Sequence, residues 1–120
     1  MPAITQPTLN EGERYVGAII SADGTRAHHI ILLPGDNDDA SHAKQTAWAK
    51  SIGGELPDRV ESALLFATMK DEFKADWYWT RDQHASLSDC AWVQDFHDGN
   101  QFCSRKVFAY RARAVRRLPI

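Results

Sequence analysis

The feature that most constrains this chain is a helix-start signal near its centre. Pro57 cannot continue a preceding element. Asp58 can accept hydrogen bonds from the free N–H groups of a first helical turn, and Glu61 follows at the spacing of a capping box. We therefore expect a helix over residues 58–70. Its core-facing stripe is expected to comprise residues at helical spacing: Val60, Ala63, Leu64, Ala67 and Thr68, widened by Leu65 and Met69.

The residues before this helix predict a β-hairpin and a shorter helix. Two largely apolar runs, 15–20 and 30–33, flank a segment that contains an Asp-Gly turn dipeptide, which is typical of a hairpin. A second helix is expected over residues 41–52, because two glycines follow it. Its expected apolar stripe is Ala43, Ala47, Trp48 and Ile52. The acidic segment 35–39 is expected to be a solvated loop that leads into this helix.

The last fifty residues change to strand periodicity. The aromatic run WYWT (77–80) predicts a short strand, and the polar segment 81–89 predicts a loop. Residues 90–96 and 101–108 flank HDGN, which indicates a second hairpin. Residues 107–115 alternate and predict a final strand with one apolar and one largely basic face. A hairpin, two helices and a β-rich second half together predict the α+β class.

Length and charge set the wider limits. At 120 residues, we expect an N-terminal arm (1–13) and one domain (14–120). The net charge of −2 disfavours nucleic acid as a partner. No run approaches the roughly 18 apolar residues of a membrane span. The N-terminus lacks signal-peptide features, and two cysteines fit a reducing compartment, so a cytoplasmic location is expected.

Four segments resemble a known family. Residues 54–64 (GELPDRVESAL), 77–80 (WYWT), 91–99 (AWVQDFHDG) and 110–117 (YRARAVRR) are similar, in order and approximate spacing, to the segments gWRLPT…EL, YWSST, AWvvdFsdG and yRvRcVR of the Lcl C-terminal-like family, a domain family of unknown function. The resemblance implies a C-type-lectin-like fold with two short helices, a mostly antiparallel twisted sheet and paired terminal strands. Small stand-alone members of this type are commonly encoded by phages and prophages. This chain departs from the pattern at Gly54-Glu55, where Trp-Arg is usual, and at Arg81, where Ser is usual.

The sequence contains neither a calcium motif nor a zinc motif, but it does contain two cysteines. The calcium-ligand motifs of C-type lectins are absent, because the corresponding strand has the sequence Trp92-Val93-Gln94. The five histidines lack metal-site spacing, so no metal and no cofactor are expected. With a two-residue turn at residues 98–99, Cys103 would lie opposite Gln94 and Cys90 opposite Val107. Either these cysteines are core residues, or they are the reactive pair of a formylglycine-generating-type thiol enzyme, whose fold is related.

The C-terminal basic residues have two interpretations. They form either a patch for an anionic partner or a set of arginines that cover apolar surface and pair with carboxylates. The residues concerned are Arg105, Lys106, Arg111, Arg113, Arg116 and Arg117.

These observations predict a non-catalytic binding module, of the phage-type accessory kind, that recognises a host or phage protein through loops on a rigid scaffold. Its expected contact residues are Trp79, Arg81, Asp82, His84, His97, Asp98 and Asn100. The alternatives are the thiol enzyme and a calcium-independent glycan-binding domain whose aromatic side chains stack on sugar rings. An exposed edge strand would also support a homodimer.

Overall fold

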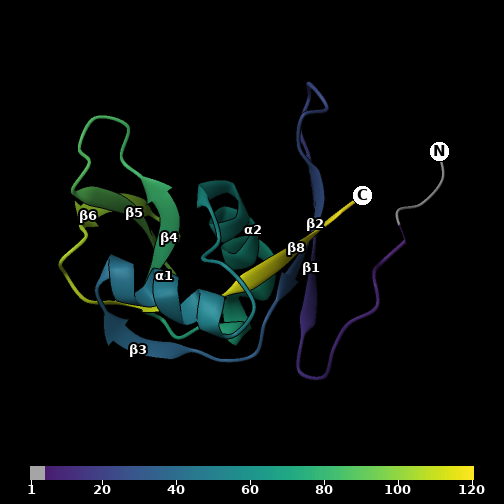
Figure 1. Cartoon of the computed structure of the whole chain (residues 1–120), viewed down its shortest axis with the longest axis horizontal. Helices are drawn as coiled ribbons and strands as arrows, with labels where there is room; N and C mark the ends of the chain where they lie inside the picture. Colours follow the sequence, from purple (N-terminus) through teal and green to yellow (C-terminus); the bar gives the residue numbers. More distant parts are fainter. Residues whose placement is uncertain (1–4) are drawn as a thin grey trace.

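The computed structural model describes residues 5–120 and confirms the α+β class. The elements, labelled in Figure 1, are β1 (Arg14–Ile20), β2 (Ala27–Leu32), β3 (Asn37–Ala40), α1 (His42–Ser51), α2 (Arg59–Met69), a 3-10 turn η1 (Lys70–Glu72), β4 (Trp77–Gln83), β5 (Cys90–Asp95), β6 (Gln101–Arg105), β7 (Tyr110–Ala112) and β8 (Val115–Pro119). The predicted N-terminal hairpin is β1–β2, and both predicted helices are present. Residues 1–4 of the expected N-terminal arm lie outside the described residues.

The strands form two sheets. One has the order β1-β2-β8 and is antiparallel, and the other has the order β3-β7-β4-β5-β6, in which the β4–β7 pair is parallel. In Figure 1 the three-stranded sheet lies on the right and strands β4–β6 on the left, with α2 between them. The last strand pairs with β2 rather than with β1, so the expected direct pairing of the terminal strands is wrong.

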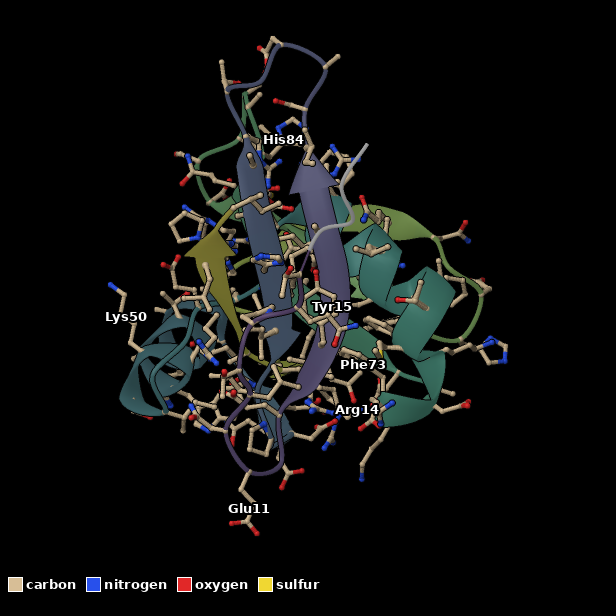
Figure 2. The ribbon with its side chains drawn as sticks, turned by 90° about the vertical axis from the view of Figure 1, so that its right-hand side faces the viewer. Glu11, Arg14, Tyr15, Lys50, Phe73 and His84 are labelled. Atoms are coloured by element: carbon tan, nitrogen blue, oxygen red, sulfur yellow. The ribbon has the colours of Figure 1, made fainter. Side chains whose placement is uncertain are left out.

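The three-stranded sheet faces the viewer in Figure 2. Tyr15 lies on β1, and its hydroxyl is 2.8 Å from Nδ1 of His29 on β2. Arg14, at the start of β1, forms an ion pair with Glu72 of η1. The first contact therefore links β1 to β2, and the ion pair joins the sheet to the segment that follows α2.

The five-stranded sheet separates two apolar clusters because side chains alternate along a strand. On β4, Trp79 packs in the cluster that adjoins α1, whereas Tyr78 packs in the cluster that contains Leu65 of α2. The two helices therefore cover opposite faces of β4.

The buried face of α2 differs from the predicted stripe. The capping box is confirmed, because Asp58 Oδ1 accepts the Glu61 N–H at 2.8 Å and Glu61 Oε1 accepts the Asp58 N–H at 2.8 Å. However, the helix buries Glu61, Ser62 and Leu65, while Val60 is 54% exposed. Glu61 is drawn inward by an ion pair with Arg117, which apolar periodicity cannot reveal.

The predicted stripe of α1 is correct for Trp48, which packs against the core, but wrong for its other members, for a similar reason. The buried residues are Gln45 and Ala49, while Ala43 and Ala47 are exposed. The Gln45 side chain donates to the carbonyl oxygens of Asp38 and Tyr110 at 2.8 and 2.9 Å. A buried amide thus fastens α1 to the β3–β7 pair.

The acidic segment 35–39 is not a solvated, helix-initiating loop. Residues 37–40 form β3, which pairs with β7, and α1 is capped by Ser41. Asp36 accepts two hydrogen bonds from Arg111 at 2.9 and 2.7 Å and one from the Tyr78 hydroxyl. This carboxylate therefore joins β7 to β4.

The second half keeps its predicted hairpin but changes its register and its ends. The strand β4 continues to Gln83, so the loop is shorter than the predicted 81–89, and β6 ends at Arg105. Gln94 pairs with Gln101 and the Asp95 N–H donates to the Asn100 carbonyl oxygen at 2.8 Å, so the turn has four residues, 96–99, rather than two. Cys103 therefore lies opposite Trp92 and Cys90 opposite Arg105, not opposite Gln94 and Val107.

The predicted final strand is two strands in different sheets, β7 and β8, and its arginines do not form one basic face. Three of them pair with carboxylates: Arg111 with Asp36, Arg116 with Glu13 and Arg117 with Glu61. Arg113 is buried and donates to the carbonyl oxygens of Glu72 and Leu33. The interpretation that these arginines pair with carboxylates is confirmed for Arg111, Arg116 and Arg117, whereas Arg113 is buried against backbone carbonyls.

Candidate binding groove

The predicted contact residues divide between three places. Trp79 is fully buried and donates its indole N–H to the Ala40 carbonyl oxygen at 3.0 Å, so it is not available on the outer surface. Arg81 points toward α1 and forms an ion pair with Glu55 at 3.2 Å. Asp82 points the opposite way, toward α2.

A groove of about 540 Å³ lies on the α2 side of the sheet. It is bounded by the first two turns of α2, the end of β4 and the β5–β6 turn. Its lining residues are Arg59, Val60, Ala63, Asp82, Gly99 and Gln101. The two segments predicted to make contact, 81–89 and 97–100, therefore both border the groove, through Asp82 and Gly99.

The side chains of Arg59 and His84 both lie against the ring of Trp92, which is beside the groove. The guanidinium carbon of Arg59 lies 3.6 Å from the centre of the Trp92 ring, which is close cation–π contact. The His84 ring stacks on Trp92 at 5.8 Å with an interplanar angle of 20°. His84 also accepts the N–H of Ser86 at 3.1 Å, so it orders the start of the loop that follows β4.

A chain of side-chain amides ties the turn to α2. Gln94, which is buried, donates to the carbonyl oxygen of Gly99 at 3.1 Å. Gln101 donates to Gln94 Oε1 and to the Arg59 carbonyl oxygen, both at 2.8 Å, and accepts the Arg59 Nε–H at 2.9 Å. The two hydrogen bonds between Gln101 and Arg59 are exposed, and through them the β5–β6 turn is joined to the first turn of α2.

The turn itself presents exposed polar side chains. His97, Asp98 and Asn100 are exposed, and Asp98 Oδ1 accepts the Asn100 N–H at 3.2 Å. Gly99 has φ +90°, and a Cβ there would lie 2.6 Å from the Phe66 ring. Only glycine therefore allows this turn to sit so close to α2.

A separate, smaller pocket of about 240 Å³ contains Arg81. Its other lining residues include Glu55, Lys50 and His42. The Nε2–H of His42 donates to the Thr80 carbonyl oxygen at 2.8 Å, and burial lowers the pKa of this histidine. Arg81 is therefore not part of the groove that contains Asp82.

The two cysteines are free thiols on the same face of the sheet as Trp92. Burial and the Asp89 carboxylate raise the pKa of Cys90, and burial raises the pKa of Cys103. The thiolate is the nucleophilic form, so a raised pKa makes each thiol less reactive at neutral pH. Within residues 5–120, no three His, Cys, Asp or Glu side chains are grouped so as to hold a metal ion.

Sequence reasoning missed the residues that shape the groove. Arg59 and Gln101 carry no motif, and their proximity depends on the four-residue turn. Trp79 was predicted as a contact residue, but it is buried. Trp77, on the same face of β4, is 43% exposed. Strand alternation places both tryptophans on one face, but it does not say where the covering helix ends.

No family model matches this chain, and a search of curated proteins finds no match. No helix in the described part of the chain is long and apolar enough to cross a membrane.

Proposed function

We propose that this chain is a non-catalytic binding module with a C-type-lectin-like fold, and that it recognises a protein partner in the groove between α2 and the β5–β6 turn. The observation that carries this proposal is the groove's combination of side chains held by mutual contacts and exposed contact groups. Arg59 is stacked on Trp92 and bonded to Gln101, while Val60 is 54% exposed at the groove. Interfaces are typically anchored by arginine and aromatic residues in well-held positions.

The resemblance to the Lcl C-terminal-like family supports the remaining parts of the proposal. Small phage- and prophage-encoded proteins of that type act without an assigned reaction, so we propose a phage-type accessory protein that engages a host or phage protein in the cytoplasm of the host cell. The raised pKa values of Cys90 and Cys103 weigh against the thiol-enzyme alternative.

Two exposed valines provide a matched test. Val60 lies in the groove, and Val107, 71% exposed, lies in the β6–β7 connection away from it. The wild-type chain, Val60→Asp and Val107→Asp would each be immobilised and incubated with lysate of a bacterial host. We expect the wild type and Val107→Asp to retain the same partner and Val60→Asp to lose it, because a buried, unpaired carboxylate is costly at an interface.

Circular dichroism and thermal unfolding of all three chains serve as the folding control. Aspartate is well tolerated in the first turn of a helix, so Val60→Asp should remain folded. A partner that is retained by Val60→Asp but lost by Val107→Asp would place the recognition surface elsewhere.

Glycan binding is the second candidate, and it is favoured by the exposed Trp77. The indole makes edge contacts with Phe102 at 5.1 Å and Tyr110 at 5.7 Å, which leaves part of its surface open for stacking against a sugar ring. A glycan array would decide this point. A signal that disappears in Trp77→Ala would promote this function, and an array without signal would remove it.

A further inference from the structure

We infer that the groove receives a peptide segment that carries an aspartate or glutamate side chain, and that Arg59 binds this carboxylate through two parallel hydrogen bonds. This inference rests on the proposed function and adds the chemical class of the ligand and the residue that selects it.

The orientation of Arg59 leaves its terminal amino groups available. The Nε–H is already bonded to Gln101 Oε1 at 2.9 Å. Among the hydrogen bonds of residues 5–120, none uses Nη1 or Nη2 of this arginine. These two groups form the forked end of the guanidinium, which matches the two oxygens of a carboxylate.

Arg59 is also held in place before any ligand arrives. Its guanidinium lies 3.6 Å above the Trp92 ring, its backbone N–H donates to Asp82 Oδ2 at 2.8 Å, and its carbonyl oxygen accepts from Gln101 at 2.8 Å. A side chain that is already ordered loses little conformational freedom on binding, so a larger part of the contact energy appears as affinity.

Other arginines of the chain are already paired. Arg26, Arg111, Arg116 and Arg117 each form an ion pair with a carboxylate at 2.6–2.8 Å. Arg59 has no carboxylate of the described chain within ion-pair distance, although it lies in a groove. A desolvated guanidinium at an interface requires a counter-charge, and the partner must provide it.

The surroundings of Arg59 define the class of anion more closely. Val60 and Ala63 provide apolar surface next to it, which suits an apolar side chain adjacent to the acid. Asp82 lines the groove, and Asp98 is exposed on the neighbouring turn. These carboxylates repel a polyanion such as nucleic acid but tolerate a single acidic residue in a peptide.

The test uses an array of random eight-residue peptides with amidated C-termini, so that side chains provide the only carboxylates. The probes are the wild-type chain, Arg59→Lys, Arg59→Gln and the control Arg105→Gln, since Arg105 is exposed on β6 and outside the groove. We expect the wild type and Arg105→Gln to enrich peptides with Asp or Glu next to an apolar residue. Arg59→Gln should lose this enrichment, and Arg59→Lys should keep it only in part, because lysine keeps the charge but not the fork.

The Kd of the best peptide and of its Asp→Asn or Glu→Gln form is then measured with the wild type and with Arg59→Gln, which gives a double-mutant cycle. For the wild type, we expect neutralising the peptide acid to weaken binding by about tenfold or more, as for a charge-assisted hydrogen-bonded pair. For Arg59→Gln, the same change should have little effect.

The inference is overturned if the wild type enriches no acidic residue, or if Arg59→Gln keeps the same preference. Val60→Asp then distinguishes failure of this inference from failure of the proposed function. Suppose that the wild type binds peptides without acidic residues. If Val60→Asp no longer binds those peptides, the groove is the binding site and only the role of Arg59 is wrong. If it binds the same peptides as the wild type, the proposed site is wrong as well.

Discussion

Glu61 is the buried charge that joins α2 to β8, and replacing it by Gln tests how much the ion-pair network stabilises the fold. Its side chain is fully buried. Oε1 accepts hydrogen bonds from Arg117 Nη2 at 2.6 Å and from the Asp58 N–H at 2.8 Å. Oε2 accepts from Arg117 Nε at 2.7 Å and lies 2.9 Å from His28 Nε2. Burial opposes ionisation, but the Arg117 and Asp58 hydrogen bonds hold the pKa of Glu61 below its ordinary value.

The magnitude follows from what Glu61→Gln leaves behind. Glutamine keeps the shape, but it removes the charge and places an N–H₂ donor against other donors. The Arg117 side chain, which is 18% exposed, then remains as a nearly buried cation. Removing one partner of a buried ion pair costs about 3–5 kcal/mol. For a domain of this size, that loss lowers Tm by about 10–20 °C and removes a large part of a total stability of about 5–15 kcal/mol.

Urea and thermal unfolding measure the change, and Glu55→Gln is the matched control. Glu55 lies 3.3 Å from the same arginine, but its side chain is 53% exposed, so its removal should cost no more than about 1 kcal/mol. The double variant Glu61→Gln/Arg117→Met should recover part of the loss, because it also removes the cation that has lost its buried partner and keeps only the exposed Glu55. A Glu61→Gln chain within about 1 kcal/mol of wild type, or equal to Glu55→Gln, would refute this reasoning.

Three further predictions concern pH and the thiols. The hydrogen bond from Arg116 lowers the pKa of Glu13 from 4.5 to about 2. The ionised Glu13 therefore stabilises the fold above pH 4.5, and this contribution is lost as the pH falls toward 2. In Glu13→Gln, the urea midpoint should fall less steeply between pH 4.5 and pH 2 than in the wild type. Burial and the hydrogen bond to Asp36 raise the pKa of Tyr78 from 10.0 to about 12. The protonated phenol therefore stabilises the fold below pH 10, and this contribution is lost as the pH rises toward 12. An absorbance titration of Tyr78→Phe should lack the last phenolate step. Replacing Cys90 and Cys103 by Ser should leave partner affinity unchanged in a binding assay, whereas complete loss would support the thiol-enzyme alternative.

Local signals in the sequence were sufficient for the elements whose stability is local. The capping box at Asp58 and Glu61 marks the start of α2 because both partners lie within one helical turn. The Asp-Gly dipeptide between two apolar runs likewise places the β1–β2 hairpin.

Buried polar residues explain why the helix faces were predicted only in part, with Trp48 and Leu65 correctly placed. Hydrophobic periodicity assumes that apolar residues face the core. In this fold, Gln45 and Glu61 occupy the inward faces of the two helices, and each has a distant partner: Tyr110, 65 residues away, and Arg117, 56 residues away. Contacts over such separations leave no pattern in a single sequence.

The hairpin turn shows the same limit at the candidate groove. The HDGN segment indicates a turn, but the Gln94 amide bonds to the Gly99 carbonyl inside it and fixes a four-residue loop. This two-residue change in register places Gln101 opposite Gln94 and within reach of Arg59. The groove could therefore be located approximately from the sequence, but its anchoring residues could not.

The tryptophan indole signals test the central claim most directly, because three of the four tryptophans occupy clearly different environments. Trp92 lies beside the groove under Arg59, Trp77 lies on the α1-side face, and Trp79 is buried. Nitrogen-15 NMR of the chain, titrated with the partner captured from the host lysate, follows each indole N–H separately. Recognition in the groove predicts that the Trp92 signal shifts while the Trp77 signal does not. A shift of Trp77 with Trp92 unchanged would contradict it.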